Sequence, residues 1–201
     1  MNRPNVVEPP QEAEVRDTIY DNITLPLVLE AYHIPSETSK EYYAIDMLTT
    51  LLSGGQSSRI YKTLVDKTQK ALQAASFPLA LEDPGLFLTF AIANAGVKAD
   101  ELEKLMDEEI GKVKSEPISD EEFQKLRNQI ENRIVTSYST DLGIAEALSD
   151  FHVFYHNTNL INFELENYMK VTKEDIQKVA QKYLVKKNRV VLYYLPKSAK
   201  K

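Results

Sequence analysis

The spacing of apolar side chains alternates between two periods along the chain. In residues 25–34 every second position shares a face, with Leu27 and Leu29 on one side and Val28 and Glu30 on the other. This alternation is typical of a half-buried strand. The same pattern predicts further strands at residues 14–20, 71–79, 85–95 and 189–195. Residues 87–92 are apolar on both faces, which indicates a strand in the interior of a sheet.

Elsewhere the apolar positions recur every three or four residues, as they do on one face of a helix. Thr38 with Glu41 and Ser119 with Glu122 have the spacing of a capping box, and Thr172 is a third candidate N-cap. These signals predict helices at residues 40–53, 100–116, 141–156, 163–169 and 173–183, and a long helix that opens at Ser119. On the long helix we expect Leu126 and Ile130 on the core face, and Arg127 and Glu131 toward solvent.

The order of these elements indicates an α+β fold. Two strands, two helices, two strands, several helices and one strand favour a mainly antiparallel sheet of about five to six strands covered by helices. The 201 residues, 43% of them hydrophobic, are sufficient for one domain with a substantial core. Residues 1–12 contain three prolines and little periodicity, so we expect an interdomain linker there and a single domain over residues 13–201.

A glycine pair interrupts the predicted helical region near its middle. Gly54 and Gly55 are expected to end the first helix, because glycine adopts the left-handed conformation without a side-chain penalty. Ser57 or Ser58 is then expected to cap a second, short helix.

The residues around this turn resemble a known family. Residues 53–65, SGGQSSRIYKTLV, resemble the Gly-Gly-x-Ser-Ser-Arg-Leu segment of the pitrilysin/insulinase zinc metallopeptidases, and residues 8–11 and 31–35 resemble the interdomain connection and the strand that follows it. The resemblance covers nearly the whole chain and is best to a carboxy-terminal domain that binds no zinc. It implies a LuxS/MPP-like metallohydrolase fold, packed against an upstream His-x-x-Glu-His domain around a chamber that admits unfolded peptides.

The histidines do not reproduce the zinc motif of that family. His152 and His156 have i, i+4 spacing, but the glutamate of the family motif is replaced by Tyr155, and that of the related zincin motif by Val153. We therefore expect no metal in this chain, with His152 packed against its neighbours and His156 capping the helix end. The resemblance implies that zinc, its water and the glutamate base belong to the upstream domain.

A second feature of the family is an arginine followed seven residues later by a tyrosine, which together bind the substrate carbonyl and the oxyanion. Alignment on the Ser-Ser-Arg segment puts these positions at Val65 and Leu72, neither of which has a side-chain donor. Lys67 and Lys70 are nearby cations outside the register. Arg59 is expected either to anchor the short helix or, with Lys67 and Lys70, to line a substrate chamber.

Composition excludes several other functions. The formal charge is −6, and the concentrated positive charge is confined to the tail, at Lys197, Lys200 and Lys201, which argues against nucleic acid as a partner. No apolar run is long enough to span a membrane. The absence of cysteine excludes disulfides and thiolate zinc sites, and fits the cytoplasm and the bacterial periplasm equally.

The remaining acidic groups are expected to be solvated. Glu121 and Glu122 fall in the first turn of a predicted helix, where negative charge suits the helix dipole, and residues 107–109 are similar. The resemblance to the pitrilysin/insulinase family implies a non-catalytic carboxy-terminal domain of a zinc endopeptidase that acts on peptides, inactive alone. Its full-length form would borrow the arginine and tyrosine from a homologous subunit in a heterodimer. The alternative is a structural or assembly subunit with the same fold.

Overall fold

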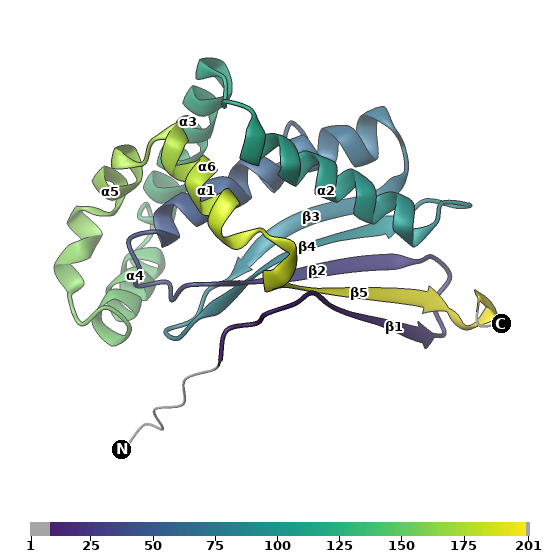
Figure 1. The fold of residues 1–201 in the computed structure, drawn as a ribbon. Helices are drawn as coiled ribbons and strands as arrows, with labels where there is room; N and C mark the ends of the chain where they lie inside the picture. Colours follow the sequence, from purple (N-terminus) through teal and green to yellow (C-terminus); the bar gives the residue numbers. More distant parts are fainter. Residues whose placement is uncertain (1–8, 200–201) are drawn as a thin grey trace.

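Five strands form one mixed sheet in the computed structural model, which describes residues 9–199 (Figure 1). The strands are β1 (Val15–Asp21), β2 (Leu27–Ile34), β3 (Ala71–Leu79), β4 (Gly85–Ala93) and β5 (Arg189–Pro196). Their spatial order is β1-β5-β2-β4-β3, and β1 runs parallel to β5 while the other neighbouring pairs are antiparallel. The predicted α+β class and mainly antiparallel sheet are confirmed.

The first and last strands of the described chain pair with each other in this sheet. β1 pairs with β5, with Val15 opposite Val190, and not with β2, its neighbour in sequence. β4 lies between β2 and β3, as the apolar run at residues 87–92 predicts. Residues 1–8 of the expected linker lie outside the described residues, and residues 9–12 belong to no helix or strand.

The long helices lie on one side of the sheet (Figure 1). The α-helices are α1 (Tyr42–Ser53), α2 (Ala99–Ser115), α3 (Asp120–Ser137), α4 (Asp141–Val153), α5 (Glu164–Lys170) and α6 (Lys173–Tyr183). A π-helix, η1 (Tyr61–Lys67), and three short 3₁₀ turns, η2 (Thr158–Asn162), η3 (Lys186–Asn188) and η4 (Lys197–Ala199), complete the described elements. Among these residues no helix combines the length and apolar composition needed to cross a bilayer.

The core lies between the sheet and this helical layer. Val28 on β2 and Phe87 on β4 point toward the helices and are fully buried. On the long helix α3, Leu126 is 2% and Ile130 1% exposed, so the predicted core face of that helix is confirmed. Arg127, expected to point to solvent, instead donates a hydrogen bond to the carbonyl of Met169 at 3.2 Å, because α5 packs beside α3.

The predicted helix caps are correct in part. Thr172 forms a full capping box with Asp175 at the start of α6. At the start of α3 half of the predicted box forms: the Ser119 hydroxyl accepts the backbone N–H of Glu122 at 3.2 Å, but the Glu122 carboxylate binds Arg59. The Thr38–Glu41 box is wrong, since α1 begins at Tyr42 without a side-chain cap.

The Glu41 carboxylate has other partners. It accepts hydrogen bonds from Lys182 at 2.7 Å and from the Tyr183 hydroxyl at 2.5 Å, both at the end of α6. The carboxylate therefore connects α1 to α6 and does not return to its own helix. A long-range contact has taken precedence over a local one here, which spacing within the sequence could not indicate.

Candidate functional site

The turn at Gly54 and Gly55 requires glycine at both positions, as the sequence indicates. A Cβ on Gly54 would lie 2.4 Å from the carbonyl oxygen of Thr50, and Gly55 has a φ of +96°. The predicted serine cap is wrong, because the Ser58 hydroxyl donates to the carbonyl of Gly55 at 2.6 Å and the cap of η1 is Ile60. The Ser58 hydroxyl therefore holds the turn closed and does not cap the helix, although the Ser58 carbonyl accepts the backbone N–H of Lys62 at 3.0 Å.

Arg59, which follows this turn, forms a two-point ion pair with Glu122 on α3. Its Nε and Nη2 atoms donate to the two carboxylate oxygens at 2.9 Å and 2.6 Å. The hydrogen bond to Glu122 raises the pKa of Arg59, and the same hydrogen bond lowers the pKa of Glu122. Glu122 is thus not the solvated residue expected from sequence. The contact joins the start of η1 to α3 and supports the anchoring interpretation of Arg59.

The two positions aligned with the family's arginine and tyrosine differ in their exposure to solvent. Val65 is half-buried on η1, whereas Leu72 is 62% exposed at a bulge near the start of β3. Of the nearby cations, Lys67 is exposed and Lys70 pairs with Glu101 on α2 at 2.9 Å. Arg59, by contrast, is held by Glu122 on α3.

The histidines lie at the surface. His152 is exposed on α4, so its predicted packing among neighbouring side chains is wrong. α4 ends at Val153, and His156 follows it with a φ of +52° and does not cap it. His33 is half-buried on β2, on the face of the sheet away from the helices.

The second face of the sheet is left uncovered by the long helices (Figure 1). The part of it formed by β2 to β5, here called the open face, is largely apolar, whereas β1 adds Asp17 beside Leu192. Strand pairing places alternate residues of β2, β3, β4 and β5 on it. They are Leu27, Leu29, Ala31 and His33; Gln73, Ala75, Phe77 and Leu79; Leu86, Leu88, Phe90 and Ile92; and Val190, Leu192 and Tyr194. None is Asp, Glu, Lys or Arg. Soluble monomers rarely expose a contiguous apolar patch of this kind unless it contacts something.

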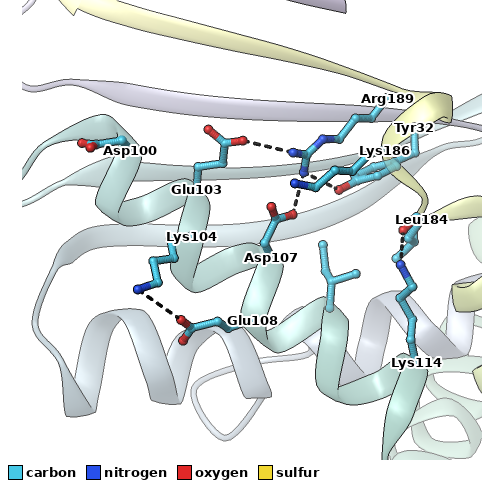
Figure 2. Close-up of a pocket in the computed structure, with 11 residues that line it drawn as sticks. Tyr32, Asp100, Glu103, Lys104, Asp107, Glu108, Lys114, Leu184, Lys186 and Arg189 are labelled. Carbon is cyan, nitrogen blue, oxygen red and sulfur yellow. Dashed lines mark hydrogen bonds and ion pairs between the residues drawn. The ribbon is translucent and has the colours of Figure 1, made fainter. Parts of the chain in front are cut away.

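A buried arginine lies between the other face of the sheet and α2 (Figure 2). Arg189, the first residue of β5, is 1% exposed. Its guanidinium donates to Asp107 at 2.6 Å and to Glu103 at 3.0 Å, both on α2. On β2, it lies 3.3 Å from Glu30 and from the Tyr32 hydroxyl. A single cation thus connects α2 to two strands.

The segment that leads into β1 enters the same cluster. Glu14 accepts a hydrogen bond from Nε of Arg189 at 2.5 Å, and Arg16 donates to Glu103 at 2.9 Å and 2.5 Å. Gln11 donates to the backbone carbonyl of Arg189 at 2.7 Å. Glu14 therefore pairs with the buried Arg189, and Arg16 pairs with Glu103 on α2.

The cluster contains more acidic than basic groups. Its ion pairs join four carboxylates, of Glu14, Glu30, Glu103 and Asp107, to the two guanidinium groups of Arg16 and Arg189. Burial, followed by the charge of Asp107, raises the pKa of Glu30 to about 8, although the charge of Arg189 opposes this. Glu30 is accordingly the member that carries a proton near neutral pH.

A cavity of about 480 Å³ opens beside the cluster, lined by charged residues of α2 and by Lys186 (Figure 2). Oxygens of Glu30, Glu103 and Asp107 lie within 4.8 Å of one another. Protein zinc sites are usually built from histidine and cysteine with few carboxylates. Here the Arg189 guanidinium already contacts all three carboxylates, so a metal ion would have to displace a buried cation. The group does not fit zinc.

Sequence reasoning missed this cluster. It assigned residues 107–109 to a solvated helix face, but Asp107 binds Arg189 and Glu109 is 3% exposed, where it accepts a hydrogen bond from Thr63 at 2.9 Å. One signal was present. The alternation in β2 puts Glu30 on the same face as Val28, and a carboxylate among core positions requires a buried partner.

Comparison with known proteins agrees with this architecture. Residues 2–130 match the family described as the peptidase M16 inactive domain. The chain is 27% identical to zinc protease PqqE of Helicobacter pylori over 194 residues, which are 96% of this chain and 44% of that protein. It therefore spans less than half the length of this curated relative.

Solved structures extend the similarity to the whole fold. A protease from Helicobacter pylori matches with a TM-score of 0.92 and 24% identity, over 97% of this chain and 47% of that one. A peptidase M16 inactive domain from Pseudomonas fluorescens matches with a TM-score of 0.82 and 14% identity, over 92% and 44%. Because the family match covers more than half of the sequence, this chain belongs to the peptidase M16 inactive-domain family.

Proposed function

We propose that this chain is the non-catalytic carboxy-terminal domain of a zinc-dependent endopeptidase, in which it helps to enclose a peptide-binding chamber. The full-length protein would contain an upstream His-x-x-Glu-His domain, against which this domain packs. The observation that carries the proposal is the open face, a broad apolar surface with no charged residue on β2 to β5. Such a surface is stable in water only when another domain or a ligand covers it for much of the time.

The chemistry of this chain is consistent with a supporting role. His152 on α4 and His156 just after it are exposed and lack the glutamate of a zinc motif, and the buried carboxylates hold an arginine. Zinc, the attacking water and the general base would therefore be supplied by the upstream domain. The contribution of this domain would be to exclude bulk water and to hold the peptide.

Val65 and Leu72 bear on how the full-length protein would work. Neither side chain can donate a hydrogen bond to a developing oxyanion, so the stabilisation that the family obtains from arginine and tyrosine would be missing. We infer that an active form borrows these donors from a homologous subunit in a heterodimer. Arg59 does not replace them, because Nε and Nη2 of its guanidinium are held by Glu122 on α3.

A second candidate function is a structural or assembly subunit. It is favoured by the similarity to a chain of complex III from Candida albicans, with a TM-score of 0.76 and 12% identity over 94% of this chain, which is a similarity of fold alone. In that case the open face would be covered permanently by other subunits and the full-length protein would cleave nothing.

Cleavage of an unstructured fluorogenic peptide in the presence of zinc tests the proposal. The 201-residue chain alone should give no turnover. The product of the upstream coding region, if it contains His-x-x-Glu-His, should bind this chain and cleave only in its presence and that of the homologous subunit. Chelator-sensitive cleavage by the isolated chain would overturn the proposal, and an upstream region without the motif would favour the assembly subunit.

A further inference from the structure

We propose that a groove in the helical layer binds a small aromatic carboxylate, a ligand with a planar ring and one negative charge. The groove lies between α1 and α6 on one side and the segment from η2 to α5 on the other, and its volume is about 590 Å³. This volume is typical of sites for small organic ligands. The proposal goes beyond the function proposed above and does not rest on it, because helices and loops, and not the strands of the open face, line the groove.

The floor of the groove is apolar. Ala44 on α1 and Val179 on α6 line it and are each 4% exposed. Leu160 on η2 and Val171, which follows α5, are half-buried around them. An apolar ligand body that enters the groove is removed from water together with these side chains, which favours binding.

Two tyrosine rings that line the groove favour a planar ligand. The Tyr43 ring meets that of Tyr168 edge to face, with centroids 4.8 Å apart. The Tyr155 ring meets that of Phe151 in the same way at 5.4 Å, and the Tyr155 hydroxyl donates to the backbone carbonyl of Glu37 at 3.0 Å. Because these contacts hold both rings in place, an aromatic ligand gains ring contacts without first ordering the side chains of the protein.

Three lysines at the rim of the groove attract an anion. Lys40, Lys170 and Lys178 all line the groove and are exposed. Lys40 has no ion-pair partner among residues 9–199. Lys170 pairs with Glu166 at 2.7 Å, and Lys178 lies 3.7 Å from Asp175. Exposed pairs of this kind contribute little to stability, so these ammonium groups can turn toward a ligand.

The two carboxylates that line the groove have partners within the protein. Glu41 accepts hydrogen bonds from Lys182 and the Tyr183 hydroxyl. Asp175 belongs to the capping box that Thr172 forms at the start of α6. In a chain with a formal charge of −6, this local excess of lysine favours an anion over a neutral or cationic ligand of the same shape.

Isothermal titration calorimetry of the 201-residue chain with naphthaleneacetate tests the proposal. Binding should be saturable, with a Kd below about 1 mM. Three matched ligands separate the features of the site: naphthaleneethanol lacks the charge, naphthylethylamine reverses it, and octanoate keeps it on an aliphatic chain. Each of the three should bind about tenfold more weakly or worse.

Two variants locate the site. Lys40→Glu should weaken binding of naphthaleneacetate about tenfold or more, because it replaces an ammonium group at the rim by a carboxylate. Lys62→Glu is its matched control, since Lys62 is exposed on η1, beyond the end of α1 that lies away from the groove. Leu160→Asp should also weaken binding, and Leu142→Asp, at a position 69% exposed at the start of α4, should not.

Thermal melts provide a second measurement and show whether each variant is folded. A ligand that binds the native state alone raises its Tm. Naphthaleneacetate should therefore raise the Tm of the unchanged chain and of both controls, and should raise that of Lys40→Glu much less.

Several outcomes would overturn the proposal. They are equal binding of naphthylethylamine, equal binding of octanoate, and unchanged affinity of a folded Lys40→Glu variant. Light scattering that shows a dimer abolished by Leu160→Asp would mean that a second copy of the chain occupies the groove, and would contradict a small-molecule site. None of these measurements depends on peptide cleavage, so failure of this inference would leave the proposed function standing.

Discussion

Arg189 on β5 and Glu14, just ahead of β1, lie 175 positions apart in sequence and form an ion pair of 2.5 Å. The pair joins the beginning of the domain to its end. Glu14 directly precedes β1, so the contact fixes where the chain enters the sheet. It also explains why β1 lies beside β5, since the buried guanidinium needs the carboxylate that this segment provides.

Removal of this cation should destabilise the domain strongly. Arg189→Met leaves the carboxylates of Glu103 and Asp107 without their buried partner, and loss of one side of a buried ion pair typically costs about 3–5 kcal/mol. Lys170→Met is the control, because Lys170 pairs with Glu166 at the surface and should contribute no more than about 1 kcal/mol. Urea unfolding measures both, and equal losses would contradict the structural role of the cluster.

The pH dependence of stability should identify Glu30. Burial raises its pKa from 4.5 to about 8, so the unfolded state ionises first and ionisation favours unfolding. The contribution of Glu30 to the unfolding free energy is therefore full below about pH 4.5 and lost as the pH rises through about 8.

Glu30→Gln removes this titration while keeping the shape of the side chain. The unfolding free energy of the unchanged protein minus that of Glu30→Gln should fall as the pH is raised from about 5 to about 8. Denaturant melts at a series of pH values provide the comparison. A difference that stays constant over this range, or that rises, would show that Glu30 is not the group that titrates.

Gly54, Gly55 and Gly111 in the helical layer should respond differently to alanine. Gly54→Ala would bring a Cβ to 2.4 Å from the Thr50 carbonyl, and Gly55→Ala would strain a residue with a φ of +96°, so both should lower stability. A Cβ on Gly111, within α2, would meet no atom within 4 Å apart from the backbone of its own helix. Gly111→Ala should therefore raise stability by about 0.5–1 kcal/mol. Similar effects at all three positions would remove the special role of the turn.

The core face of α3 can be tested with a pair of leucines. Leu126→Ala should cost about 2–5 kcal/mol, because the side chain is 2% exposed and its removal leaves a cavity. Leu142→Ala, at 69% exposure on α4, should change stability by about 0.5 kcal/mol or less. A small loss at Leu126 in denaturant melts would mean that the face of the helix has been assigned incorrectly.

The sequence predicts the elements of this fold because their periodicity is strong and local. The alternation in β2, the apolar run of β4 and the stripe on α3 each reflect contact with a single core. The parallel pairing of β1 with β5 was not predictable in this way. It depends on contacts between residues about 175 positions apart, for which neither strand carries a local signal.

The site was less predictable, for a related reason. Glu41 and Glu122 have the spacing of capping residues, yet each carboxylate binds a cation from a distant helix. A charged side chain can pair with any of several groups, and the tertiary structure determines which of them lies within reach. The same limitation concealed the cluster around Arg189, whose members come from four separate segments.

The central claim is that this domain supplies no chemistry of its own and leaves the oxyanion without its usual donors. Its most direct test is the rate at which the full-length protein, purified alone with zinc, cleaves an unstructured peptide. With Val65 and Leu72 in place of the donors, the rate should be lower than that of ordinary metallopeptidases by about 10²–10³ for each missing donor, and a homologous subunit that carries the arginine and tyrosine should restore it. Full activity of the full-length protein without a partner would contradict the account.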